Sequence, residues 1–368
     1  MSPPVGIAVL GAGLFATLAH LPAIASLGRE TPVLLKAVYS RSERSAQNLA
    51  ATASELKLGK PAVYHDGDAS ANLDTLLGRS DISAVIVALP ITQLPGVIIE
   101  ALAAGKHVLS EKPVAPDVKT GAMLLATYNS QHKPKGLKWR VAENFEAEPG
   151  FRAAGKAIRD GKIGKVICFS SRVVDYIDKT SPCYLAPWRN IPDHQGGFVL
   201  DIGVHSAAVL RVILPSPITH ISGFASLNKD YLAPHDTIHT IMRCADGSQG
   251  IFELSFAAPF PSLTQAGNGV TVTGTCGWLL VTQNQDVITT TIRSMTKVDG
   301  ELESEKEEVI EEKNWRGVEC ELKSFLNVIA GEDDGLGNPL GALRDVAIIQ
   351  AALNSQGKLV DLDKLISQ

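Results

Sequence analysis

Apolar residues form short, nearly unbroken runs over the first 130 residues, and segments of helical character separate these runs. The strand-like runs span 5–13, 33–40, 62–64, 82–90 and 107–113. The helical segments span 45–56, 70–79 and 93–106; Ser70 or Asn72 begins the second, and Gly105 ends the third. Strands that are apolar along their whole length and alternate with helices predict a parallel sheet with both faces covered.

After about residue 140 the pattern changes to β-branched runs separated by turn-forming dipeptides, which are typical of antiparallel strand pairs. Helical segments at 151–164, 319–331 and 342–356 accompany these runs, and the acidic run 299–313 predicts a solvated edge or loop. We therefore expect two domains. An α/β domain would occupy 1–140, and an α+β domain with an open, largely antiparallel sheet would occupy 141–368.

The composition of the chain indicates which kinds of binding partner are not expected. The chain of 368 residues carries a formal net charge of −5, and no apolar stretch reaches the length of a membrane-spanning helix. We therefore expect no nucleic-acid partner, no membrane association and a cytoplasmic location. The five cysteines include no CxxC pair and the histidines do not cluster, so we expect no disulfide framework and no metal site.

A glycine loop directly follows the first predicted strand. Gly11, Gly13 and Ala16 fit the pattern G-x-G-x-x-G/A, in which the first glycine permits a tight turn and the second lets a pyrophosphate approach the backbone. Ala16 allows close packing of helix and strand, and the N–H groups at the start of that helix attract phosphate. Leu14 and Phe15 complete the loop. The pattern predicts a Rossmann dinucleotide-binding domain; a turn that serves packing alone is the alternative.

The end of the second strand bears on the choice of nicotinamide cofactor. An NAD-selective domain usually carries Asp or Glu there, to accept hydrogen bonds from the ribose hydroxyls. Here the strand ends in Ser40 and Arg41, and an arginine can pair with a 2′-phosphate. We therefore expect NADP(H). The alternative is a solvated arginine beside NAD(H).

Lys112 follows the fifth predicted strand, within the sequence Ser-Glu-Lys-Pro. Ligands of parallel α/β sheets bind beyond the carboxyl ends of the strands, where a lysine can stabilise negative charge on a substrate oxygen. A lysine that faces solvent is the alternative.

Asp201 and His205 lie four residues apart, so a helix over 198–210 would place both on one face. A carboxylate and an imidazole together can hold substrate hydroxyls and relay a proton near neutral pH. A plain contact on the helix surface is the alternative. The glycines at 196, 197 and 203 would let the backbone approach a ligand closely.

Together these motifs resemble those of the glucose–fructose oxidoreductase / inositol dehydrogenase / MocA family. The likeness rests on the glycine loop, on Glu111-Lys112-Pro113, and on Gly196-Gly197 followed by Asp201 and His205. It extends over essentially the whole chain, and a fungal NADP(H)-dependent branch is the most similar.

The resemblance implies roles for these residues. Lys112 and His205 would form the catalytic pair, Asp201 would orient the substrate, and the nicotinamide would lie between the two domains. The Lys112–Pro113 bond would be cis. Trp188 and Arg189 would border the pocket and contact the cofactor, and Asn144 would contact the substrate. Further cofactor contacts would come from Leu89, Pro90, Thr92 and Glu111.

Three departures from the family pattern argue against inositol or glucose as the substrate. Leu89-Pro90-Ile91-Thr92-Gln93 replaces the usual Thr-Pro-Asn and histidine after the fourth strand. Phe198 replaces the third glycine of a Gly-Gly-Gly run, and Glu146 stands where sugar-acting members carry a basic residue.

We therefore expect an NADP(H)-dependent oxidoreductase that transfers hydride between the nicotinamide and a hydroxyl- or carbonyl-bearing carbon of a small molecule. A non-catalytic NADP(H)-binding regulator and a reductase of C=N or C=C bonds are the alternatives.

Helices at 151–161 and 319–329 would cover the second sheet only in part. Apolar runs at 251–256 and 270–281 then predict a homodimer or a dimer of dimers.

Overall fold

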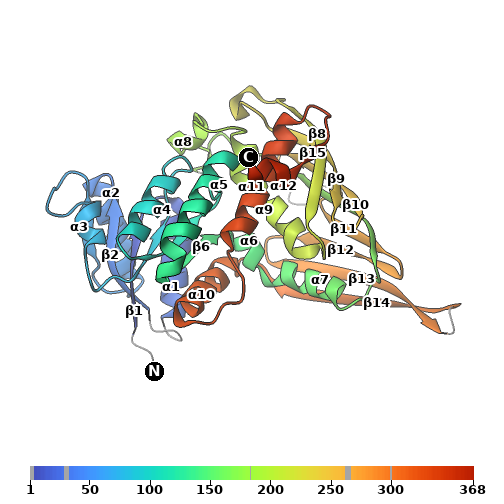
Figure 1. Cartoon of the computed structure of the whole chain (residues 1–368), viewed down its shortest axis with the longest axis horizontal. Coiled ribbons are helices and arrows are strands. Elements are labelled where there is room, and N and C mark those ends of the chain that lie inside the picture. Colours follow the sequence, from blue (N-terminus) through green and yellow to red (C-terminus); the bar gives the residue numbers. More distant parts are fainter. Residues whose placement is uncertain (1–3, 29–32, 183, 262–266, 299–300) are drawn as a thin grey trace. The chain divides into compact units, whose positions relative to one another are not determined.

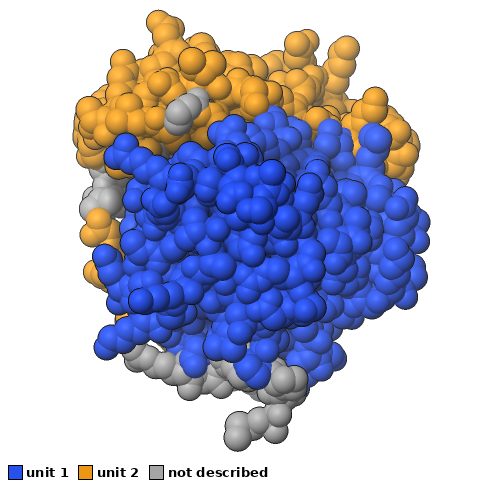
Figure 2. All heavy atoms as spheres, turned by 90° about the vertical axis from the view of Figure 1, so that its left-hand side faces the viewer, with its two compact units in different colours: residues 1–116, 120–143, 318–342 blue, residues 117–119, 144–317, 343–368 orange. Residues whose placement is uncertain are grey.

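The computed structural model describes residues 4–28, 33–182, 184–261, 267–298 and 301–368 (Figure 1). Its chain forms two compact units, coloured separately in Figure 2. Unit 1 comprises 1–116, 120–143 and 318–342, and unit 2 comprises 117–119, 144–317 and 343–368. The predicted boundary at 140/141 lies close to the crossing after Glu143. A single boundary is nevertheless wrong, because 318–342 returns to unit 1.

Unit 1 is built on a six-stranded parallel sheet in the order β3-β2-β1-β4-β5-β6. The strands are β1 (Val5–Leu10), β2 (Val33–Ser40), β3 (Ala62–His65), β4 (Ala84–Val87), β5 (His107–Glu111) and β6 (Trp139–Ala142). The sequence predicted the first five within a few residues, and the parallel sheet is confirmed. In this doubly wound order the strand sequence reverses between β1 and β4, and ligands bind beyond the carboxyl ends of the strands at such a point.

Helices connect these strands. A π-helical segment (Ala16–His20) leads into α1 (Leu21–Leu27), and a second one (Tyr128–His132) follows α5 (Val118–Thr127). The remaining connecting helices are α2 (Glu43–Glu55), α3 (Leu73–Leu77) and α4 (Leu94–Ala103). Asn72, one of the two predicted caps, is the N-cap of α3, because its side chain accepts a hydrogen bond from the backbone N–H of Thr75.

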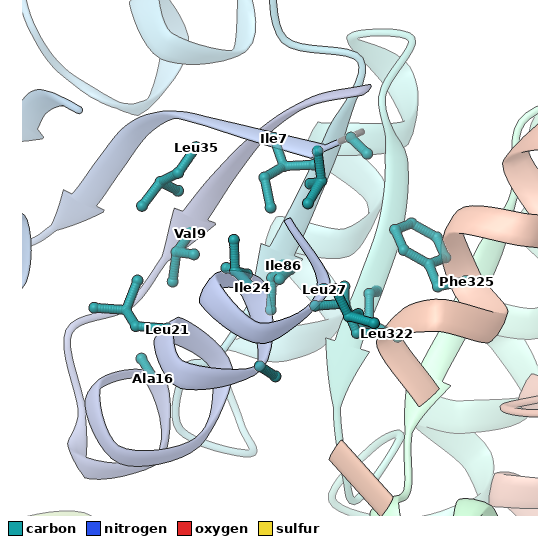
Figure 3. Close-up of a cluster of buried hydrophobic side chains, with 14 of the residues drawn as sticks. Ile7, Val9, Ala16, Leu21, Ile24, Leu27, Leu35, Ile86, Leu322 and Phe325 are labelled. Atoms are coloured by element: carbon teal, nitrogen blue, oxygen red, sulfur yellow. The ribbon is translucent and has the colours of Figure 1, made fainter. Parts of the chain in front are cut away.

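The core of unit 1 includes a helix from the end of the chain. Figure 3 shows Leu322 and Phe325 of α10 (Gly317–Ala330) among the side chains of α1, β1 and β2. Both are 1% exposed or less. The expectation that the segment 319–329 covers the second sheet is therefore wrong. The apolar stripe of α10 is buried against the first domain instead.

Unit 2 contains a nine-stranded sheet in the order β14-β13-β12-β11-β7-β10-β9-β8-β15. Only β7 and β10 run parallel among its pairs in the described ranges, so the predicted, largely antiparallel sheet is confirmed. Residues 301–313 of the acidic run form the edge strand β14, and 299–300 lie outside the described residues. The strands are β7 (Val166–Val174), β8 (Ile218–Ser226), β9 (Thr237–Cys244), β10 (Gln249–Ser255), β11 (Gly269–Gly274), β12 (Gly277–Gln283), β13 (Val287–Val298), β14 (Glu301–Lys313) and β15 (Val360–Asp361).

Two helices pack on one face of this sheet: α7 (Pro149–Arg159) lies against β12–β14, and α9 (Phe198–Ile213) lies against β7 and β10. The other helices are α6 (Asn144–Ala147), α8 (Pro187–Asn190), α11 (Pro339–Asn354) and α12 (Leu362–Ser367). Within the described ranges, no helix is both long enough and apolar enough to cross a membrane.

Candidate active site

The glycine loop of unit 1 has the backbone that a dinucleotide requires. Gly11 has a φ of +110°, and a Cβ there would lie 2.0 Å from the carbonyl oxygen of Ala88, so no larger residue fits. A Cβ on Gly13 would meet nothing within 4 Å, which leaves open space beside the backbone. Ala16 is completely buried behind the loop. A close-packed first glycine and an open second glycine fit a bound pyrophosphate.

The residues around Gly13 border this open space. Leu14 and Phe15 are 45% and 41% exposed, and both are already helical. The carbonyl oxygen of Gly13 accepts hydrogen bonds from the backbone and hydroxyl of Thr17, at 3.2 and 3.1 Å. Thr17 therefore fixes the backbone of the loop, while the side chains of Leu14 and Phe15 remain partly exposed to solvent.

The end of β2 lies beside this loop, because the N–H of Gly11 donates to the carbonyl of Tyr39 at 2.8 Å. Ser40 is half-buried and Arg41 is exposed, and their predicted contact with a 2′-phosphate stays a prediction. Sequence reasoning missed Asp66, which follows β3 and accepts a 2.6 Å hydrogen bond from the Tyr39 hydroxyl. Burial, together with this hydrogen bond, raises the pKa of Tyr39. The end of β2 carries no acid of its own, but a carboxylate from the residue after β3 lies beside it.

The segment after β4 supplies the next predicted contacts. Leu89 and Pro90 are half-buried and Thr92 is exposed, in a turn that precedes α4. Leu89 approaches the glycine loop, since its Cδ2 would lie 3.2 Å from a Cβ on Gly11. The structure therefore places Leu89 beside the loop, and the predicted cofactor contacts of this segment stay a prediction.

Glu111 ends β5 and Lys112 follows it directly, so the predicted strand end is confirmed. The Lys112–Pro113 peptide bond is cis, as the resemblance implied. Lys112 is half-buried. The carboxylate of Glu111 accepts a hydrogen bond from the backbone of Lys112 and lies 2.7 Å from Nε2 of His20. Sequence reasoning had singled out neither His20 nor this contact.

Unit 2 carries the other predicted catalytic residues on α9, the helix that the sequence predicted over 198–210. Asp201 is 2% exposed, and its carboxylate accepts a 2.6 Å hydrogen bond from Nε of Arg189. The Arg189 guanidinium lies over the ring of Trp188, with its carbon 4.4 Å from the ring centroid. The Arg189 guanidinium is therefore held by the Asp201 carboxylate and by the Trp188 ring.

One turn further along α9, His205 is half-buried and stacks on Phe145. The ring centroids are 4.5 Å apart at an interplanar angle of 26°. Phe145 also stacks on Phe151, at 5.8 Å and 20°. Asn144, the predicted substrate contact, precedes Phe145 on α6 and is buried. The imidazole thus belongs to a stack of three rings.

Glu146 lies next to this stack but does not act as a free carboxylate. Arg211 donates to both of its oxygens, at 2.9 and 3.2 Å, and also to both oxygens of Asp345. Burial would lower the pKa of Arg211, but the two carboxylates outweigh it and hold that pKa well above its usual value. The residue that departs from the family pattern therefore ties α6 to α9 and α11.

The glycines near α9 serve packing within the protein. A Cβ on Gly196 would lie 2.5 Å from Leu353, and one on Gly203 would lie 2.7 Å from Leu254. Packing within the protein accounts for these two glycines, and the expectation that the backbone approaches a ligand here stays a prediction. In the described ranges, no three His, Cys, Asp or Glu side chains are grouped to hold a metal ion.

Comparison with known proteins identifies the family. Residues 5–136 match the model described as an oxidoreductase family with an NAD-binding Rossmann fold, and 151–280 match the GFO/IDH/MocA C-terminal domain. The chain belongs to the GFO/IDH/MocA family. Dehydrogenase FPY6 of Fusarium mangiferae is 38% identical over 358 residues, which cover 95% of this chain and 96% of that protein.

Two further GFO/IDH/MocA comparisons extend this result. The 1,5-anhydro-D-fructose reductase of Ensifer adhaerens is 29% identical over 70% of this chain and 72% of its own length. The crystal structure of an oxidoreductase from Thermotoga maritima is 28% identical, with a TM-score of 0.82 over 98% of this chain and 99% of that one. The resemblance inferred from the motifs is confirmed. The protein is an oxidoreductase whose first unit binds a nicotinamide dinucleotide.

Proposed function

We propose that this protein is an NADP(H)-dependent oxidoreductase that transfers hydride between the nicotinamide and a carbon bearing a hydroxyl or carbonyl group. The position of Lys112 carries the proposal. This lysine directly follows β5, at the edge of the parallel sheet where β1 leads into the glycine loop. A cation there can stabilise negative charge on a substrate oxygen.

The protein's own side chains would bind and protonate the substrate, while the bound cofactor supplies or accepts the hydride. In reduction, His205 would donate a proton to the developing alkoxide and the Lys112 ammonium would hydrogen-bond the same oxygen. In oxidation both roles reverse. Asp201 would orient the substrate, and its hydrogen bond with Arg189 would hold that guanidinium in place beside it.

The preference for NADP(H) would come from Ser40 and Arg41. Ser40 ends a strand that carries no acid at its tip and Arg41 follows it, so the exposed guanidinium of Arg41 can form a bidentate pair with a 2′-phosphate.

The substrate would be a small sugar-like or related carbonyl compound. A relative of this chain is named 1,5-anhydro-D-fructose reductase, which makes that ketone a sensible first candidate. A non-catalytic regulator would need only the cofactor site, and a reductase of C=N or C=C bonds would keep the same proton donors. Substrate profiling separates these alternatives from carbonyl reduction.

The test is a panel of carbonyl compounds that includes 1,5-anhydro-D-fructose, with imines and conjugated alkenes as the comparison set, in the presence of NADPH. We expect consumption of NADPH with at least one carbonyl compound. Lys112→Met should greatly slow the consumption of NADPH. Lys119→Met, at an exposed lysine on α5, should leave the rate unchanged. Binding of NADPH without turnover of any compound would support the regulator instead.

A further inference from the structure

His20 links the helix after the glycine loop to the end of β5. It is the last residue of the π-helical segment Ala16–His20, and it is completely buried. Its Nε2 lies 2.7 Å from Oε1 of Glu111, and its ring makes an edge contact with Phe15 at 5.4 Å. Single π-helical turns are rare and often occur at functional sites.

Glu111 continues the link to Lys112. While Oε1 contacts His20, Oε2 accepts a hydrogen bond from the backbone N–H of Lys112 at 3.3 Å. The Glu111 side chain is only 10% exposed. One carboxylate therefore joins the helix that starts at the glycine loop to the backbone of the lysine.

Stability alone does not explain the buried contact between His20 and Glu111. A buried imidazole and carboxylate lose their hydration, and an aliphatic pair of similar size would often be as stable or more so. The contact with His20 fixes one oxygen of Glu111, which leaves the other oxygen aimed at the N–H of Lys112.

We propose that His20 and Glu111 form a positioning pair that holds the backbone at Lys112 and thereby sets where its ammonium group lies relative to the bound cofactor. The proposal rests on the catalytic role proposed for Lys112. His20 acts through Glu111 and would not itself touch substrate.

The chain contains a matched control. His132 ends the second π-helical segment of unit 1 and is 3% exposed. Neither of its ring nitrogens has a hydrogen-bond partner in the described structure. His20→Leu and His132→Leu therefore remove the same ring from similar surroundings, but only the first breaks a contact with a carboxylate. His20→Gln retains a group that can hydrogen-bond Glu111.

The first measurement is amide hydrogen exchange at Lys112 in the NADPH-bound protein, read by mass spectrometry with fragmentation. We expect exchange to speed up roughly tenfold or more in His20→Leu, the effect of losing one charge-assisted hydrogen-bond network. Exchange in His20→Gln and His132→Leu should stay near the parent rate. Unchanged exchange in His20→Leu would overturn the proposal without any substrate being known.

The second measurement is turnover with the compound that the carbonyl panel returns. His20→Leu should lower kcat by roughly 10- to 100-fold with little change in KM, because a misplaced group costs chemistry more than binding. His20→Gln should restore most of it. Combining His20→Leu with Lys112→Met should be no worse than Lys112→Met alone. Additive losses would overturn the proposal, whereas full activity of Lys112→Met would instead refute the proposed function.

Discussion

Side chains that are neighbours on a helix can have quite different surroundings. Asp201 and His205 share one face of α9, as their spacing predicted, but Asp201 is buried beneath Arg189 while His205 stacks on Phe145. The spacing fixes the shared face because an α-helix repeats every 3.6 residues. It does not reveal the partners, because Arg189 and Phe145 come from segments that only tertiary folding brings together.

The cofactor preference can be tested at Arg41. Arg41→Ala should weaken NADPH binding by about 1.5–3 kcal/mol, the value of a hydrogen-bonded charge pair, and leave NADH binding nearly unchanged. Fluorescence titration with both cofactors measures this. Lys60→Ala removes another exposed charge from unit 1 and should alter neither affinity.

Equal affinity of the parent protein for NADH and NADPH would contradict this prediction. It would point to Asp66, whose carboxylate lies beside the end of β2 through its hydrogen bond with Tyr39. No pattern in the sequence marks Asp66, because only the pairing of β2 with β3 brings it to this position.

At the scale of elements, the sequence predicts each strand of the parallel sheet better than it predicts where a helix packs. The strands β1 and β4 are apolar and buried along nearly their whole length, so their burial needs no further information. The amphipathic pattern of α10 shows that one side is buried but not against which sheet. Its assignment to unit 1 depends on contacts over nearly the whole length of the chain.

The packing of α10 gives a stability prediction. Leu322→Ala should lower the free energy of unfolding by about 2–5 kcal/mol, because it leaves a cavity among completely buried side chains. Lys60→Ala changes an exposed position of unit 1 outside α10 and should cost under about 0.5 kcal/mol. Urea unfolding of both variants measures the difference, and similar small losses would show that α10 is not part of this core.

The junction of β5 with β6 predicts a dependence of stability on pH. Nδ1 of His107 accepts a 3.0 Å hydrogen bond from the backbone of Lys138. Burial, together with the nearby Lys138 ammonium, lowers the pKa of His107. Because the pKa of His107 is lower in the folded protein than in the unfolded chain, the unfolded chain takes up the proton first as the pH falls below about 6.5. Protonation therefore favours unfolding in this range. The contribution of His107 to stability is therefore lost on acidification through that range.

His107→Asn tests this, since the amide oxygen of asparagine can accept the same hydrogen bond and does not titrate. Thermal unfolding between about pH 7.5 and pH 5.5 should show a smaller loss of stability in this variant than in the parent. Equal losses in both proteins would assign the pH dependence to other groups.

For the whole molecule, the sheet of unit 2 has two different faces. Helices α7 and α9 pack on one face. On the other, Ile241, Ile251 and Phe224 are 65%, 51% and 68% exposed, and Ile241 lies directly opposite Ile251 in the β9–β10 ladder. Exposed apolar residues that adjoin one another commonly mark an interface between proteins.

We predict that this face joins two copies of the chain, as a homodimer or within a dimer of dimers. Light scattering should give a mass of at least twice 39.1 kDa at micromolar concentration. Ile241→Glu should reduce it toward the monomer, because it buries a charge in the interface. Met123→Glu, at a residue of unit 1 that is 63% exposed, should not. A parent protein near 39 kDa would contradict the prediction.

Hydride transfer assisted by Lys112 and His205 is tested most directly by single-turnover oxidation of bound NADPH, with the compound returned by the carbonyl panel. Lys112→Met and His205→Asn should each lower this rate by roughly 10²–10⁴ while NADPH affinity stays within a few-fold of the parent. The double variant should be little slower than the slower single variant, because in the proposed mechanism both groups would act on one oxygen. Rates near the parent value in both single variants would contradict the account.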